Sequence, residues 1–201
     1  YGLTGRNWGA VQSALESFCR LTDASEVVTR LRMVKSQAEL LFVEQAAELA
    51  DDALDKAVSL ARPGENEGRI LAGMHSVVFS GGGDYPGNEF IIGSGRDALL
   101  CRYHSGRRVL DGKDQLTLEF AGVYRRYHAC LMRTLIIGRP CRQQIEMHSV
   151  CREALAVCRE NVRPGNPMGA VFDAHTEVMD EGGFQAHRLN ACGYSLGATF
   201  T

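Results

Sequence analysis

The sequence lacks a large excess of charge of either sign. It has 22 Lys and Arg residues and 24 Asp and Glu residues, so the net charge is −2. Both signs are interspersed along the 201 residues. Proteins that bind nucleic acid or an anionic membrane electrostatically carry a basic patch, so we expect neither partner. No apolar run is long enough for a spanning helix, and the first residues, YGLTGRNWG, lack the layout of a signal peptide.

Paired cysteines are also absent. The chain has seven cysteines, an odd number, and none of them form a C-x-x-C pair. A disulfide framework or a zinc ribbon would show closer, paired spacing. The pattern therefore indicates reduced thiols in a cytoplasmic protein.

The bulk composition is that of an ordinary globular protein, with 45% hydrophobic and 23% charged residues. The chain lacks an initiator Met and stops at GYSLGATFT, directly after a glycine-rich turn. We therefore expect a fragment of a longer chain, with enough apolar material for a real core.

Start and stop signals indicate several helices. Ser36-Gln-Ala-Glu39 has the pattern of a capping box, and Arg62-Pro63-Gly64 has the pattern of a helix stop, which predicts one helix between them. Similar signals predict further helices at about 10–20, 66–78, 143–161 and 167–181, extended backbone at 26–34, a glycine-rich loop at 81–87 and a short strand at 90–93.

A weak internal repeat relates one segment in the first half of the chain to one in the second half. Residues 53–68 and 154–169 match at Ala, Leu, Arg, Pro, Gly and a final Gly, with a constant offset of 101 residues, and a second helix follows each copy. The repeat indicates two similar α+β halves related by a pseudo-twofold axis, with a ligand groove between them. The alternative is that R-P-G is a common helix stop used twice.

Residues 116–134, LTLEFAGVYRRYHACLMRT, predict two strands joined by a turn. Period-two alternation places Glu119 on one face of the first strand, and Arg126, His128 and Cys130 on one face of the second. If the strands pair as a hairpin, Glu119, His128 and Cys130 can look into one cavity, as a catalytic cluster would. The alternative is a solvated edge strand whose carboxylate points at water.

The order of these motifs resembles that of the creatinase/aminopeptidase P superfamily, the pita-bread hydrolases. Its other elements are the L-x-x-Y-x-x-G-x-R-x-L-x-x-x-D stretch (100–114), Y-H-x-x-x-x-R-T and a G-x-x-x-G turn. The resemblance covers residues 30–201 and implies an α+β fold with two pseudo-symmetric halves around a curved, mostly antiparallel sheet, truncated at its C-terminal end. Residues 1–29 then resemble the tail of a separate N-terminal domain and its linker. The resemblance also implies a homodimer.

The chain departs from this family's metal-binding pattern. At the positions of two metal-binding aspartates and one metal-binding histidine it has Glu119, Cys130 and Tyr194. A paired dication site needs several hard oxygen ligands and usually an imidazole, so the substitutions predict no metal and no other cofactor. A thiolate-bound zinc that uses Cys130 with His128 or His187 is left open.

One branch of the superfamily shares these changes. The chain resembles ectoine hydrolases, which are regarded as metal-independent, in its Glu119-Phe-Ala-Gly122 strand, its Gly82-Gly-Asp-Tyr-Pro86 loop and its Gly193-Tyr-Ser-Leu-Gly197 turn. The resemblance implies hydrolysis of a C–N bond in a small amino-acid-derived substrate, with an ectoine-like cyclic amidine favoured. Arg102, where relatives usually have a histidine, and Ala198-Thr-Phe-Thr201 depart from the pattern of this branch.

A mechanism follows as a hypothesis. Glu119 attacks the amidinium carbon or deprotonates a water, and His128 protonates the departing nitrogen. The substrate-binding residues we expect are Asp84, Tyr85, Arg102, Arg126, Cys130 and Tyr194. Plain alternatives exist for two of these residues: His128 as a hydrogen-bonded core residue and Cys130 as small packing.

Two rival functions are left open. One is a metal-dependent Xaa-Pro peptidase-like hydrolase, and the other is a catalytically inactive pita-bread domain that only binds ligands.

Overall fold

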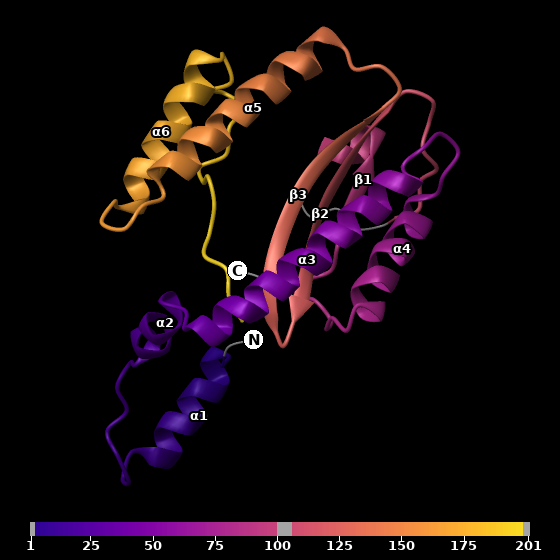
Figure 1. Ribbon diagram of the computed structural model, residues 1–201. Helices are drawn as coiled ribbons and strands as arrows, with labels where there is room; N and C mark the ends of the chain where they lie inside the picture. Colours follow the sequence, from indigo (N-terminus) through magenta and orange to yellow (C-terminus); the bar gives the residue numbers. More distant parts are fainter. Residues whose placement is uncertain (1–2, 100–105, 199–201) are drawn as a thin grey trace. The chain divides into compact units, whose positions relative to one another are not determined.

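The computed structural model describes residues 3–99 and 106–198, and the chain divides into two units at Ser36 (Figure 1). The first unit holds α1 (Gly5–Leu15) and α2 (Ser25–Met33). The second holds α3 (Gln37–Leu60), α4 (Glu67–Ser80), β1 (Ile91–Ser94), a 3-10 helix (Gly95–Leu99), β2 (Asp114–Tyr124), β3 (Tyr127–Ile137), α5 (Arg142–Asn161) and α6 (Met168–Glu181). Among the described residues, no helix is both long and apolar enough to cross a membrane.

The first unit corrects one expectation from the sequence. Residues 26–34 were expected to be extended because of their β-branched residues, but Ser25–Met33 form helix α2. Asp23 accepts hydrogen bonds from the backbone N–H and the hydroxyl of Ser25 and so turns the chain into the helix. Glu26 and Arg30, one helical turn apart, pair at 2.6 Å. These local interactions outweigh the strand preference of the β-branched side chains.

The capping box at the start of α3 forms as predicted. The Ser36 hydroxyl accepts the Glu39 backbone N–H at 3.3 Å, and Glu39 Oε2 accepts the Ser36 backbone N–H at 2.7 Å. The helix ends at Leu60, and Gly64 takes a φ of +84°, a conformation that suits glycine.

The first helices of the two repeated pairs, α3 and α5, end in the same way. Ala61 and Val162 both donate their N–H to the carbonyl four residues earlier, at 2.9 Å in each case. Gly64 and Gly165, 101 positions apart in the sequence, have φ values of +84° and +91°. The helices that follow, α4 and α6, each have 14 residues. The repeated R-P-G motif therefore marks a repeated helix-turn-helix geometry.

The sheet is antiparallel, with strand order β1-β2-β3. Alternate residues of β2, namely Leu116, Leu118 and Phe120, are buried against α3 and α4, which cover one face of the sheet (Figure 1). The core also contains Ile70, Met74 and Val78 from α4, Ile92 from β1, and Ala50, Ala53 and Ala57 from α3. The small side chains of α3 allow this helix to lie close to the sheet.

Gly122 lies where the backbones of α3 and β2 come very close together. A Cβ atom on this residue would lie 1.9 Å from the Ala46 carbonyl oxygen and 2.5 Å from the Ala50 backbone nitrogen. Both are backbone atoms, so no side-chain rotation could make room.

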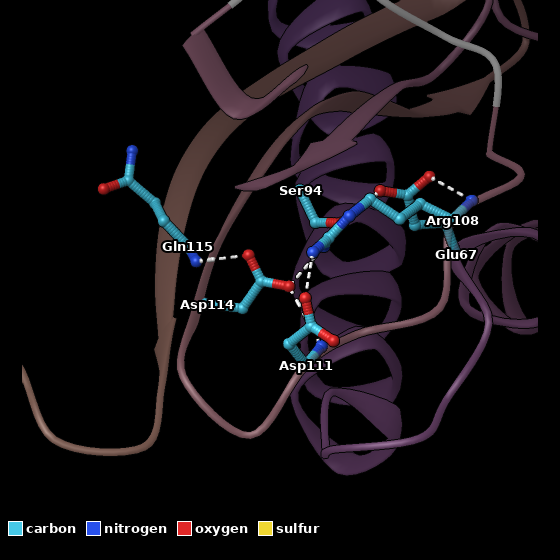
Figure 2. Close-up of polar contacts among 6 residues, drawn as sticks. All are labelled: Glu67, Ser94, Arg108, Asp111, Asp114 and Gln115. Atoms are coloured by element: carbon cyan, nitrogen blue, oxygen red, sulfur yellow. Dashed lines mark hydrogen bonds and ion pairs between the residues drawn. The ribbon is translucent and has the colours of Figure 1, made fainter. Parts of the chain in front are cut away.

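A buried polar network anchors the other end of the sheet, as Figure 2 shows. Glu67, fully buried in the first turn of α4, accepts the Ser94 hydroxyl at 2.5 Å and the Arg108 backbone N–H at 3.1 Å. The Arg108 guanidinium donates to Ser94 at 2.7 Å and pairs with Asp114 and Asp111. The network ties α4, β1 and the start of β2 together.

Arg108 also sets the ionisation of Asp114. Burial alone would raise the pKa of this carboxyl group, but hydrogen bonds from Arg108 and from the backbone N–H groups of Asp111 and Gln115 outweigh it, so the pKa is lowered. Asp114 therefore stabilises the fold above the unfolded-state pKa of aspartate, about 3.9, and loses this effect as the pH falls through its lower folded pKa.

We expect Gly122→Ala to lower the free energy of unfolding by at least about 2 kcal/mol, because the backbone of α3 must move away from β2. Gly112→Ala is the matched control, since nothing lies within 4 Å of its added Cβ, and it should change stability by no more than about 0.5 kcal/mol. Urea unfolding measures both. Equal stability of the two variants would contradict the close approach.

We expect Arg108→Met to cost at least about 2 kcal/mol at neutral pH, because it leaves the Asp114 carboxylate, 2% exposed, without its cation. The deficit should shrink as the pH falls below about 4 and towards the lowered folded pKa of Asp114, below which this carboxyl group is protonated in both proteins. Arg142→Met, which breaks a pair whose arginine is 93% exposed, should cost no more than about 0.5 kcal/mol. A deficit that does not change with pH would exclude Asp114 as its source.

Candidate functional site

The hairpin of β2 and β3 places the predicted residues on one face. Its register sets Glu119 opposite Met132, Ala121 opposite Cys130 and Val123 opposite His128. Directly opposed residues of an antiparallel pair project to the same side of the sheet. Since the alternate residues of β2 face α3 and α4, Glu119, Cys130 and His128 share the opposite face, as the alternation of the sequence predicts.

Cys130 interacts with both Glu119 and Tyr194. Burial of the half-buried thiol raises its pKa, a hydrogen bond with Tyr194 lowers it, and the nearby charge of Glu119 raises it again, with a net upward shift. The three residues that the resemblance places at the family's metal-ligand positions therefore lie together in this fold. Glu119 is half-buried, so the described part of the chain does not enclose it in the cavity expected from the sequence.

A small apolar cluster of hairpin residues lies next to this site. Ala121 and Val123 are fully buried, and Cys130 packs against them. The apolar packing of Cys130 agrees with its plain interpretation as a core residue, while its contact with Tyr194 leaves its substrate-binding role a prediction.

The glycine-rich loop before β1 is bound to the tip of the hairpin. Asp84 donates its N–H to the Val123 carbonyl at 2.9 Å, and its carboxylate accepts the Arg126 N–H at 3.0 Å. Tyr85 is exposed, with its ring centroid 4.8 Å from that of Phe79. Asp84 therefore fixes the loop, while Tyr85 remains available at its surface.

His128 is a buried residue, 3% exposed, with contacts on two sides. Its Nε2 accepts the Gly87 N–H at 2.9 Å, and its backbone N–H donates to the Gly197 carbonyl at 2.9 Å. No sequence pattern predicts these contacts, since neither glycine is near His128 along the chain.

The two arginines expected to bind substrate are placed differently from one another. Arg126 is not on the predicted face of β3, because it forms the hairpin turn with Arg125, and both have positive φ values, 73° and 50°. Strand alternation does not extend into a turn, which explains the difference. Arg102 lies outside the described residues.

The donor atoms of this cluster do not match a paired metal centre. Glu119 offers one carboxylate, Cys130 a thiol whose raised pKa disfavours the thiolate that metals bind, and Tyr194 a phenol. Within residues 3–99 and 106–198, no three His, Cys, Asp or Glu side chains are grouped so that they could hold a metal ion.

Comparison with known proteins supports the fold and the family. Residues 42–201 match the sequence pattern of metallopeptidase family M24. An Xaa-Pro dipeptidase of Pyrococcus furiosus is 26% identical over 187 residues, covering 92% of this chain and 53% of the relative. The ectoine hydrolase of Halomonas elongata is 26% identical over 190 residues, covering 90% of this chain and 47% of the relative.

The solved structures agree. The Xaa-Pro dipeptidase from Bacillus anthracis superposes with a TM-score of 0.90 at 22% identity, over 98% of this chain and 55% of that one. The expected pita-bread fold is thereby confirmed. The chain spans about half the length of the curated relatives it matches. Because the family pattern extends over most of its residues, the chain belongs to metallopeptidase family M24.

Proposed function

We propose that this chain is part of a hydrolase that opens a C–N bond of a small amino-acid-derived substrate, with an ectoine-like cyclic amidine favoured, and that Glu119 is its catalytic carboxylate. The observation that carries the proposal is the cluster of Glu119, Cys130 and Tyr194, which the resemblance places at three metal-ligand positions of the family. The similarity to an ectoine hydrolase supports the substrate class.

In the proposed reaction, Glu119 takes a proton from water while the water oxygen attacks the amidinium carbon. One C–N bond then breaks, and both water protons end on the departing nitrogen, which leaves as an ammonium group. The carbon becomes an amide carbonyl. Because the amidinium group is cationic, its approach to the Glu119 carboxylate is electrostatically favoured.

The remaining residues have binding roles in this proposal. Tyr194, 51% exposed beside Cys130, has room to contact a ligand next to Glu119. Asp84 and Tyr85 are proposed to contact the ligand from the glycine-rich loop. The hydrogen bonds of His128 favour its interpretation as a core residue. In this proposal Glu119, and not His128, therefore delivers the proton to the departing nitrogen.

A second candidate is a metal-dependent Xaa-Pro peptidase-like hydrolase. The family match and the similarity to an Xaa-Pro dipeptidase favour it. In that case the residues of this chain would have to be supplemented by ligands from elsewhere in the full-length protein, because Glu119 alone supplies a carboxylate within the cluster described above.

We expect Glu119→Gln in the full-length protein to lower kcat for ectoine hydrolysis by about a thousandfold or more, because the amide cannot accept a proton from water. Glu153→Gln, an exposed residue on α5, is the matched control and should keep the wild-type rate. Chromatographic detection of the ring-opened acetylated diaminobutyrate measures both. Near-normal turnover in Glu119→Gln would reject the role of Glu119, and ligand binding without turnover in the wild type would indicate an inactive binding domain.

We further expect the full-length protein to keep its activity in the presence of a chelator and to contain less than stoichiometric metal by elemental analysis. Stoichiometric Mn, Fe, Co or Zn together with inactivation by the chelator would instead establish the second candidate.

A further inference from the structure

His128 joins two segments that are far apart in the sequence. It lies on β3, and its side chain accepts the N–H of Gly87, 41 positions away, at 2.9 Å. Its backbone N–H donates to the carbonyl of Gly197, also at 2.9 Å. The first segment, 82–87, carries Asp84 and Tyr85, and the second, 193–197, carries Tyr194. One residue therefore contacts both segments that are proposed to bind substrate.

The contact with Gly87 fixes the protonation of the ring. A nitrogen that accepts a hydrogen bond has a free lone pair, so the proton of the neutral imidazole is on Nδ1. Burial lowers the pKa of His128, and hydrogen bonds with the backbone at Arg126 and Gly197 only partly offset this effect. The ring is therefore held neutral, with Nε2 directed at a backbone N–H of the loop.

Asp84 and His128 hold opposite ends of the same loop. Asp84 is bound to the hairpin through the Val123 carbonyl and the Arg126 N–H. Gly87, three residues later, is bound through His128. Tyr85 lies between these two attachments, so its position depends on both. Loss of the second attachment would leave this part of the loop held at one end.

We propose that His128 is a positioning residue: its ring holds the 82–87 loop against the hairpin, and its backbone N–H holds the 193–197 segment, so that Tyr194 lies beside the Glu119 site. The residue acts through these segments and does not itself transfer a proton to substrate. The catalytic part of this inference rests on the proposed function, whereas the attachment of the loop does not.

The test compares His128→Gln with His128→Ala in the full-length protein. The Gln amide oxygen can reach the place of Nε2 and accept the Gly87 N–H, but it cannot serve as a proton donor of catalytic strength. Alanine removes the acceptor. We expect amide hydrogen exchange in peptides covering 82–88 to be about tenfold faster in His128→Ala, and close to the wild-type rate in His128→Gln.

The kinetic readout separates positioning from proton transfer. We expect His128→Ala to raise the KM for ectoine by about fivefold or more while kcat changes by less than about threefold, and His128→Gln to restore most of the KM. Equal and large losses of kcat in both variants, with unchanged exchange in 82–88, would overturn the inference in favour of a catalytic acid. Unchanged exchange in His128→Ala would overturn it as well.

The two proposals fail in distinguishable ways. If the wild-type protein does not hydrolyse ectoine, the proposed function fails, and the exchange experiment still decides the role of His128. If His128→Ala does not fold, nitrogen NMR of the wild-type imidazole replaces it: a proton on Nδ1 with Nε2 unprotonated supports the inference, and a proton on Nε2 overturns it.

Discussion

The contact between α3 and Gly122 is the constraint on which the site depends. At this point the backbone of the helix lies directly on the backbone of β2, with no side chain between them. The contact fixes the helix-facing side of the hairpin, and strand alternation then fixes the other side, where Glu119, Cys130 and His128 project. Because Gly122 has no Cβ atom, α3 can pack directly on one face of the sheet. This packing in turn sets the position of the Glu119 carboxylate on the opposite face.

The two ends of the sheet are held by different forces. At the start of β2, charged groups are paired in a polar network whose buried members are Glu67, Ser94 and Asp114. At the hairpin tip, the contacts are hydrogen bonds that involve backbone groups together with Asp84 and His128. The first arrangement gives rigidity by ion pairing, and the second gives precise attachment of loops that carry polar side chains.

Local patterns could be predicted from the sequence, and distant contacts could not. The capping box of Ser36 and Glu39 depends on four consecutive residues, and the shared face of Glu119 and Cys130 depends on strand alternation, so both are visible in the sequence. The pita-bread fold was recognised by resemblance. Helix α2 was missed because an ion pair and a turn outweighed β-branched residues, and the bonds of His128 were missed because they join separate segments.

The turn at the hairpin tip has a cost that follows from its composition. Arg125 and Arg126 have φ values of 50° and 73°, where a side chain is disfavoured by roughly 1 kcal/mol per residue and Asn-Gly is the usual choice. The Arg126 N–H nevertheless meets the Asp84 carboxylate in this geometry. The hairpin tip thus combines an unfavourable backbone conformation with two positive charges beside the Asp84 carboxylate, so relieving the strain with Asn-Gly would also remove both charges.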